Sequence, residues 1–185
     1  MIRYAHTNEG DEVSQVTFLG KPLQLAGDPP RAGERARDFT AVRFSPEEGL
    51  VEVSLADLPA KPCLLSVVPS LDTNVCSQQT KTFNERLAGY GPAIAAYTVS
   101  VDLPFAQNRF CGAEGIDNVA MLSDYQRRSF GTSWGMLIDE LQLLARGVFV
   151  LDASGVVTYA EVVDEVTDHP SYDAVLGALD ELANR

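Results

Sequence analysis

Cysteine and histidine are scarce in this chain of 185 residues, which has three cysteines and two histidines. An odd number of cysteines argues against a framework of structural disulfides. The spacings between Cys63, Cys76 and Cys111 (13 and 35 residues, by subtraction) match no zinc-binding pattern, and His6 and His169 lie near opposite ends of the chain. We therefore expect no metal centre, and nothing else in the sequence calls for a cofactor.

Long apolar runs and positive charge are also lacking. No apolar run approaches the roughly 18 residues of a membrane helix, and residues 1–6 do not show the basic-then-apolar pattern of a signal peptide. The 14 Lys and Arg residues are outnumbered by 26 Asp and Glu residues, which gives a formal charge of −12. Such an excess repels nucleic-acid phosphates and anionic membranes. We expect a cytoplasmic protein with neither nucleic acid nor membrane as a partner.

The length and the 45 % apolar content fit one globular domain with a real core. Residues 1–13 are polar and are expected to form a flexible tail. Residues 14–185 contain no repeat, low-complexity tract or linker, so we assign them to a single domain.

The order of apolar runs and turn signals predicts the fold. Residues 16–25 resemble a β-hairpin with Gly20 and Lys21 in its turn. The pattern further predicts strands at 39–42, 51–55, 64–68, 93–101, 119–122, 147–152 and 156–160, helices at 77–87, 105–112 and 172–182, a helical turn at 125–130 and a partly helical segment at 137–145. This order indicates an α/β sheet covered on both faces, of the thioredoxin-like type, with an extra β-hairpin in front.

The most informative stretch lies where the strand at 64–68 meets the helix that follows. Pro69 ends the strand, and Asp72 or Thr73 can cap the helix. Cys76 precedes the apolar helix positions 83 and 87 by 7 and 11 residues, so it lies on their face in the first helical turn. Unpaired N–H groups and the positive end of the helix dipole stabilise a thiolate there, and the thiolate is the nucleophilic form. The alternative is that Cys76 is a small core residue, as free cysteines often are.

Two motifs carry a resemblance to a known family. Residues 69–76 (PSLDTNVC) contain the P-x-x-x-T-x-x-C signature of peroxiredoxins and are similar to the longer signature of the bacterial thiol peroxidases, an atypical two-cysteine subfamily. Residues 102–112 (DLPFAQNRFCG) resemble the second-cysteine segment of that subfamily. Residues 144–152 and 161–167 resemble its C-terminal half, and the similarity runs from about residue 16 to 182.

The resemblance implies a role for each matching residue. Cys76 aligns with the peroxidatic cysteine, which attacks a peroxide and becomes a sulfenic acid. Thr73 would hydrogen-bond the thiolate and the peroxide, and Pro69 would shield the sulfur from bulk water. Arg146 would stabilise the thiolate and polarise the O–O bond, since a guanidinium stays charged and offers several fixed donors. Cys111 aligns with the resolving cysteine of an intrachain disulfide.

The resemblance also implies an enzyme that reduces hydrogen peroxide and organic hydroperoxides, is recycled by thioredoxin and serves antioxidant defence and redox homeostasis. In the family, the enzyme is a homodimer built through the active-site side. A disulfide needs Cα atoms within about 7 Å. Because two separate helices carry Cys76 and Cys111, we expect the first turn around Cys76 and the 105–112 segment to unwind locally on oxidation.

Other interpretations stay open from the residues alone. A thiol–disulfide oxidoreductase of the same fold usually has C-x-x-C at the helix start, and Gln79 stands where the second cysteine would be. A redox sensor would form the same disulfide with little turnover. Taken singly, Arg146 could be a surface arginine and Cys111 a buried helix cysteine. We expect Cys63, in the middle of a strand, to be a core residue.

Overall fold

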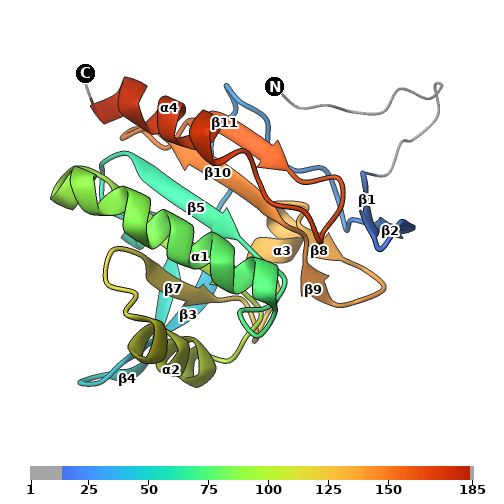
Figure 1. The fold of residues 1–185 in the computed structure, drawn as a ribbon, viewed down its shortest axis with the longest axis horizontal. Coiled ribbons are helices and arrows are strands. Elements are labelled where there is room, and N and C mark those ends of the chain that lie inside the picture. Colours follow the sequence, from blue (N-terminus) through green and yellow to red (C-terminus); the bar gives the residue numbers. More distant parts are fainter. Residues whose placement is uncertain (1–13, 184–185) are drawn as a thin grey trace.

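One mixed β-sheet forms the centre of the computed structural model, which describes residues 14–183. Its seven strands are, in sheet order, β11 (Val157–Val162), β10 (Gly147–Leu151), β5 (Cys63–Val67), β6 (Ala95–Ser100), β7 (Ala120–Ser123), β3 (Thr40–Ser45) and β4 (Gly49–Ser54) (Figure 1). The neighbours β5, β6 and β7 run parallel, and the strands on either side pair antiparallel. The central strand β5 is buried along its whole length, as its continuous apolar run predicts.

Helices cover both faces of this sheet. The helices α1 (Asn74–Leu87), α2 (Pro104–Glu114) and α4 (Tyr172–Ala183) pack against one face, and the short α3 (Ser129–Ser133) packs against the other. Two 3-10 turns lie in connections: Leu55–Asp57 between β4 and β5, and Ala88–Ala93 between α1 and β6. The α/β sheet with two covered faces is present as predicted. No helix within residues 14–183 is long and apolar enough to cross a membrane.

The alternation of side chains along β5 divides the core into two clusters. Leu65 and Val67 point to the α3 side, where Trp134 is fully buried. Leu64 points to the opposite side, beneath α1 and α4, where Phe83 is also fully buried. The loop that follows β5 is therefore anchored by a strand that contributes to both clusters.

An N-terminal hairpin precedes the sheet, as predicted. Its strands are β1 (Gln15–Phe18) and β2 (Lys21–Gln24). The predicted turn was one residue too late: Phe18 pairs with Lys21, so the turn residues are Leu19 and Gly20. Both have positive φ, 51° and 76°, as a two-residue hairpin turn of type I′ requires.

The prediction of partial helix at residues 137–145 was wrong. This segment forms two short antiparallel strands, β8 (Leu137–Ile138) and β9 (Leu143–Leu144), and Ile138 also bridges Leu25 next to β2. Adjacent residues such as Leu144 and Ala145 are both fully buried. An amphipathic surface helix buries one stripe and exposes the rest. Here the two ends of the segment are buried in the same core cluster, and the exposed turn at 139–142 joins them.

Two further boundaries differ from the predictions. The helix expected at 105–112 continues to Glu114 and ends at Gly115, whose φ of 65° is the left-handed conformation that caps a helix. Gly112 lies inside the helix. The helical turn expected at 125–130 is α3, which begins at Ser129 because Asp124 accepts hydrogen bonds from the N–H groups of Phe130 and Gly131. The predicted flexible tail, residues 1–13, lies outside the described residues, and so does His6.

Candidate active site

Cys76 is the third residue of α1, with Thr73 as the N-terminal cap. The cysteine is fully buried on the face it shares with Phe83 and Leu87, as predicted. The Thr73 side chain does not cap the helix. Its Oγ1 lies 2.9 Å from Cys76 Sγ and 3.1 Å from the Ser70 carbonyl oxygen. Both atoms are acceptors, so the single hydroxyl proton can be donated either to the sulfur, which is the nearer of the two, or to the carbonyl oxygen. The sulfur also lies in the first helical turn, where backbone N–H groups lack partners within the helix.

The second donor to the sulfur is Arg146, directly before β10. Its guanidinium makes three separate contacts: Nη2 lies 3.3 Å from Cys76 Sγ, Nη1 donates to Gln79 Oε1 at 2.7 Å, and Nε donates to the Val166 carbonyl oxygen at 2.9 Å. A planar guanidinium with a partner on each of its three nitrogens has a fixed direction. The structure therefore brings together Cys76, Thr73 and Arg146, three of the five residues that the sequence predicted for the site.

Arg146 is only 2 % exposed. In the part of the chain that the structure describes, no carboxylate lies within ion-pair distance of its guanidinium. Buried charges in proteins are normally paired, because an isolated charge is costly in an apolar interior. The ionisable group in contact with this cation is the Cys76 thiol. The guanidinium is therefore placed to pair with the Cys76 sulfur.

Gln79 is a site residue that the sequence argument used only as evidence against a C-x-x-C motif. It is fully buried, and its amide joins Arg146 to β5 by donating from Nε2 to Ser66 Oγ at 2.8 Å. Its signal in the sequence was the spacing: Gln79 is three residues after Cys76 and four before Phe83, so it lies on the buried face of α1. A polar residue on that face needs a partner in the core.

The loop between β5 and α1 is held by Asp102, the second residue before α2. Pro69 is buried at the end of β5, and the next two residues are bound to the Asp102 carboxylate. Ser70 Oγ donates to Oδ1 at 2.7 Å, and the Leu71 N–H donates to Oδ2 at 2.8 Å. One carboxylate thus ties the loop that carries Pro69 and Thr73 to the start of the helix that carries Cys111.

Cys111 lies on α2, half-buried, and all three cysteines are free thiols. Burial, and then the nearby Asp117 carboxylate, raise the pKa of the Cys111 thiol to about 11. At neutral pH this thiol is protonated and is a weak nucleophile. Cys76 and Cys111 thus occupy separate helices and different electrostatic surroundings in this conformation.

Comparisons with known proteins agree with this geometry. Residues 31–176 match the Redoxin family. The thiol peroxidase of Bacillus subtilis (strain 168) is 49 % identical over 166 residues, which cover 90 % of this chain and 96 % of that protein. The thiol peroxidase of Streptococcus pneumoniae (strain ATCC BAA-255 / R6) is 48 % identical over 163 residues, covering 88 % and 97 %. This chain belongs to the thiol peroxidases of the Redoxin family.

Solved structures place the fold in the same family. A peroxiredoxin-like protein from Aquifex aeolicus superposes with a TM-score of 0.83 at 38 % identity, covering 91 % of this chain and 96 % of that one. A thiol peroxidase from Chromobacterium violaceum superposes with a TM-score of 0.79 at 25 % identity, covering 90 % and 95 %. The predicted thioredoxin-like fold of the peroxiredoxin type is confirmed, and so is the predicted resemblance to thiol peroxidases.

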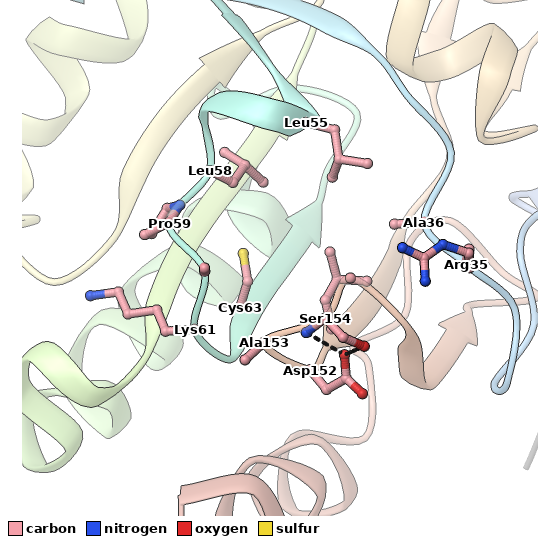
Figure 2. Close-up of a pocket in the computed structure, with 13 residues that line it drawn as sticks. Arg35, Ala36, Leu55, Leu58, Pro59, Lys61, Cys63, Asp152, Ala153 and Ser154 are labelled. Carbon is pink, nitrogen blue, oxygen red and sulfur yellow. Dashed lines mark hydrogen bonds between the residues drawn. The ribbon is translucent and has the colours of Figure 1, made fainter.

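Cys63 of this thiol peroxidase is remote from the candidate site. It opens β5, whereas Pro69 follows the end of that strand; the four residue steps from Cys63 to Val67 span about 13 Å. Cys63 lies against an open pocket of about 230 Å³ with Leu55 and Leu58 (Figure 2). Burial raises the pKa of this thiol to about 12. Cys63 is a core residue, as predicted. Residues 14–183 contain no group of three or more His, Cys, Asp or Glu side chains that could hold a metal.

Proposed function

We propose that Cys76 is the peroxidatic residue of this thiol peroxidase. The observation that carries the proposal is the buried Arg146 guanidinium, which has no carboxylate partner within residues 14–183 and lies 3.3 Å from Cys76 Sγ. The thiolate attacks one peroxide oxygen, so that an S–O bond forms while the O–O bond breaks. The second oxygen takes up a proton and leaves as water or alcohol, and Cys76 remains as a sulfenic acid.

The other predicted residues support this step. The hydroxyl of Thr73 lies 2.9 Å from the sulfur and can donate its one proton either to the sulfur or to a peroxide oxygen that approaches it. Arg146 stabilises the negative charge that moves from sulfur to the leaving oxygen, as fixed donors do in a site with little water. Pro69 is buried next to the loop and keeps water from the sulfur. We propose hydrogen peroxide and organic hydroperoxides as substrates.

Cys111 is proposed as the resolving cysteine. Its thiolate attacks the Cys76 sulfur, an S–S bond forms, and the hydroxyl of the sulfenic acid leaves as water after protonation. Both cysteines lie in helices, α1 and α2, and we propose that the first turn of α1 and the 105–112 segment unwind so that the two sulfurs reach disulfide geometry. The raised pKa of the Cys111 thiol keeps it inactive until this change exposes it. Thioredoxin then reduces the disulfide, which fits a reducing, cytoplasmic location and a role in antioxidant defence.

The test of this cycle is peroxide consumption coupled to thioredoxin, thioredoxin reductase and NADPH. The wild type and Cys63→Ser are expected to turn over continuously. Cys111→Ser is expected to consume about one equivalent of peroxide and then stop, because its sulfenic acid has no internal partner. Peptide mapping of the peroxide-treated wild type without reductant should identify a 76–111 disulfide. Continuous thioredoxin-dependent turnover by Cys111→Ser would exclude the resolving role, and a wild type that forms the disulfide without turnover would support a redox sensor instead.

A homodimer built through the active-site side is also proposed. Of the large apolar side chains exposed within residues 14–183, Leu50, Leu103 and Phe105 are 44 %, 53 % and 57 % exposed. Phe105 packs on Phe44 with ring centroids 5.6 Å apart, and Leu50 pairs with Phe44 across the β3–β4 hairpin. We propose that these side chains, together with Leu103 at the start of α2, form one patch. The patch begins one residue after Asp102, which holds the active-site loop. An exposed apolar patch of this kind is typical of an interaction surface.

Sedimentation tests the dimer. The wild type is expected at twice the 20.0 kDa chain mass, and Phe105→Asp is expected to shift to the monomer, because a carboxylate would be buried without a partner. Leu141→Asp is the matched control, since Leu141 is exposed but lies in the 139–142 turn, outside the patch. A Phe105→Asp protein that remains dimeric would place the interface elsewhere.

A further inference from the structure

One of the three contacts that fix the direction of the Arg146 guanidinium is made with a main-chain carbonyl group in a loop. Arg146 Nε donates to the Val166 carbonyl oxygen at 2.9 Å. Val166 follows β11 in a segment, residues 163–167, that belongs to no helix and to none of the seven sheet strands. Loop backbone is generally more mobile than the elements it connects. For this carbonyl to orient Arg146, other contacts must fix the segment.

The N-terminal hairpin supplies the first of these contacts. Thr17 of β1 makes two main-chain hydrogen bonds to the segment. Its N–H donates to the Asp164 carbonyl at 2.6 Å, and its carbonyl accepts from the Val166 N–H at 2.8 Å. The Val166 residue is thus held between the hairpin, through its N–H, and the arginine, through its carbonyl. Figure 1 shows the hairpin beside the segment that joins β11 to α4.

The Glu165 carboxylate supplies the second set of contacts. It accepts from the N–H groups of Leu19 and Gly20 at 3.0 Å each and from Thr17 Oγ1 at 2.9 Å. On its own segment it accepts from the Thr167 N–H at 3.2 Å and from Thr167 Oγ1 at 2.7 Å. One side chain therefore joins the tip of the hairpin to the segment that contains Val166.

The turn conformation explains why these donors are available. Leu19 has a φ of 51°, which is unfavourable for a residue with a branched side chain. In this turn the N–H groups of Leu19 and Gly20 both point at the same carboxylate. The hydrogen bonds offset the unfavourable conformation of Leu19, so the hairpin tip and Glu165 stabilise one another.

We propose that Glu165, together with the β1–β2 hairpin, positions Arg146 for its contact with Cys76. The carboxylate fixes the 163–167 segment, the Val166 carbonyl holds Nε, and Nη2 is thereby directed at the sulfur. Glu165 is a positioning residue, because it touches neither the sulfur nor the guanidinium. The inference rests on the proposed role of Cys76 and assigns a function to the hairpin.

The charge of Glu165 is a testable part of this arrangement. The Gly20 N–H and then the Thr167 hydroxyl are the main causes that lower its pKa from 4.5 to about 2. The donors facing it within residues 14–183 are N–H and hydroxyl groups that do not titrate in this range. Because the folded pKa lies below the ordinary value, the ionised carboxylate adds stability above about pH 4.5, and this contribution is lost as the pH falls towards 2. The difference in urea midpoint between the wild type and Glu165→Gln should shrink over that interval. An unchanged difference would contradict the stabilising role of the ionised Glu165 carboxylate.

The positioning role is tested with Glu165→Gln and a matched control, Glu140→Gln. Glu140 binds the same hairpin through the Gln24 N–H, at 3.1 and 3.2 Å, and has no hydrogen bond to the 163–167 segment among the described residues. Glu165→Gln is expected to slow iodoacetamide alkylation of Cys76 at pH 7 and peroxide consumption by about three- to tenfold. Glu140→Gln should match the wild type. Thr17→Val, which removes one of the five hydrogen bonds to Glu165, is the milder variant and should act in the same direction.

Double variants separate positioning from general stability. If Glu165 acts through the guanidinium, adding Glu165→Gln to Arg146→Gln should change neither the alkylation rate nor its pH profile further. The proposal would be overturned if Glu165→Gln left the alkylation rate of Cys76 at its wild-type value. It would also be overturned if Glu165→Gln slowed alkylation equally in the wild-type and Arg146→Gln proteins. A wild type that consumes no peroxide would refute the proposed function, while the alkylation result would still decide the role of Glu165.

Discussion

Replacing Cys76 with serine is expected to abolish peroxide consumption, with a loss of at least about 10⁴-fold, as for removal of other catalytic nucleophiles. A serine hydroxyl fits the same space and can still accept from Thr73 and Arg146, so the protein should fold normally. It does not ionise near neutral pH and cannot stop at an oxidised state as sulfur does. The measurement is peroxide loss in the absence and presence of thioredoxin.

Cys63→Ser is the internal control for this experiment. Cys63 lies at the other end of β5, and burial raises the pKa of its thiol to about 12, so its removal should leave the peroxide rate within about twofold of the wild type. If Cys76→Ser still consumed peroxide substantially, and replacing Cys63 or Cys111 abolished that consumption, the nucleophile would be another cysteine.

The position of Cys76 could be predicted because its determinants are local. A buried strand, a proline, a capping residue and the apolar spacing to Phe83 together place the cysteine in the first turn of α1. Residues 137–145 show the opposite case. Their apolar pattern is compatible with a helix, but pairing of Ile138 with Leu25, more than 100 residues earlier, makes the segment extended. Pattern reasoning does not include such long-range pairing.

The partners of the active-site residues were the least predictable part. Arg146 is oriented by the Gln79 side chain and by a main-chain carbonyl at Val166. A carbonyl is present in every residue, so nothing in the sequence distinguishes the one that binds the arginine. The link from Glu165 to the hairpin tip likewise depends on backbone N–H groups and on a turn whose position was predicted one residue too late. The proposed reactive groups could thus be selected from the sequence, whereas the contacts that hold them depend on tertiary structure.

The substitution Arg146→Gln tests most directly how far Cys76 depends on the groups around it. Glutamine is neutral and shorter, so the Cys76 thiolate would lose its counter-charge and the developing oxyanion its strongest donor. Removal of one such donor lowers rates by about 10²–10³-fold in other enzymes, and we expect a loss of that size in peroxide consumption. The Val166 carbonyl and Gln79 Oε1 would also lose their donor, at a cost of about 1–3 kcal/mol for each buried group left unpaired.

Arg146→Lys separates charge from geometry in the same position. A lysine keeps the positive charge, but its single ammonium group cannot contact Cys76, Gln79 and Val166 in the three directions that the guanidinium reaches. If charge alone mattered, this variant would match the wild type; if the fixed direction of the guanidinium also matters, it should fall between the wild type and Arg146→Gln. Stopped-flow peroxide consumption and alkylation of Cys76, each on protein shown to be folded, measure both effects. Arg146→Gln activity within about threefold of the wild type would mean that the helix terminus and Thr73 stabilise the thiolate without the arginine.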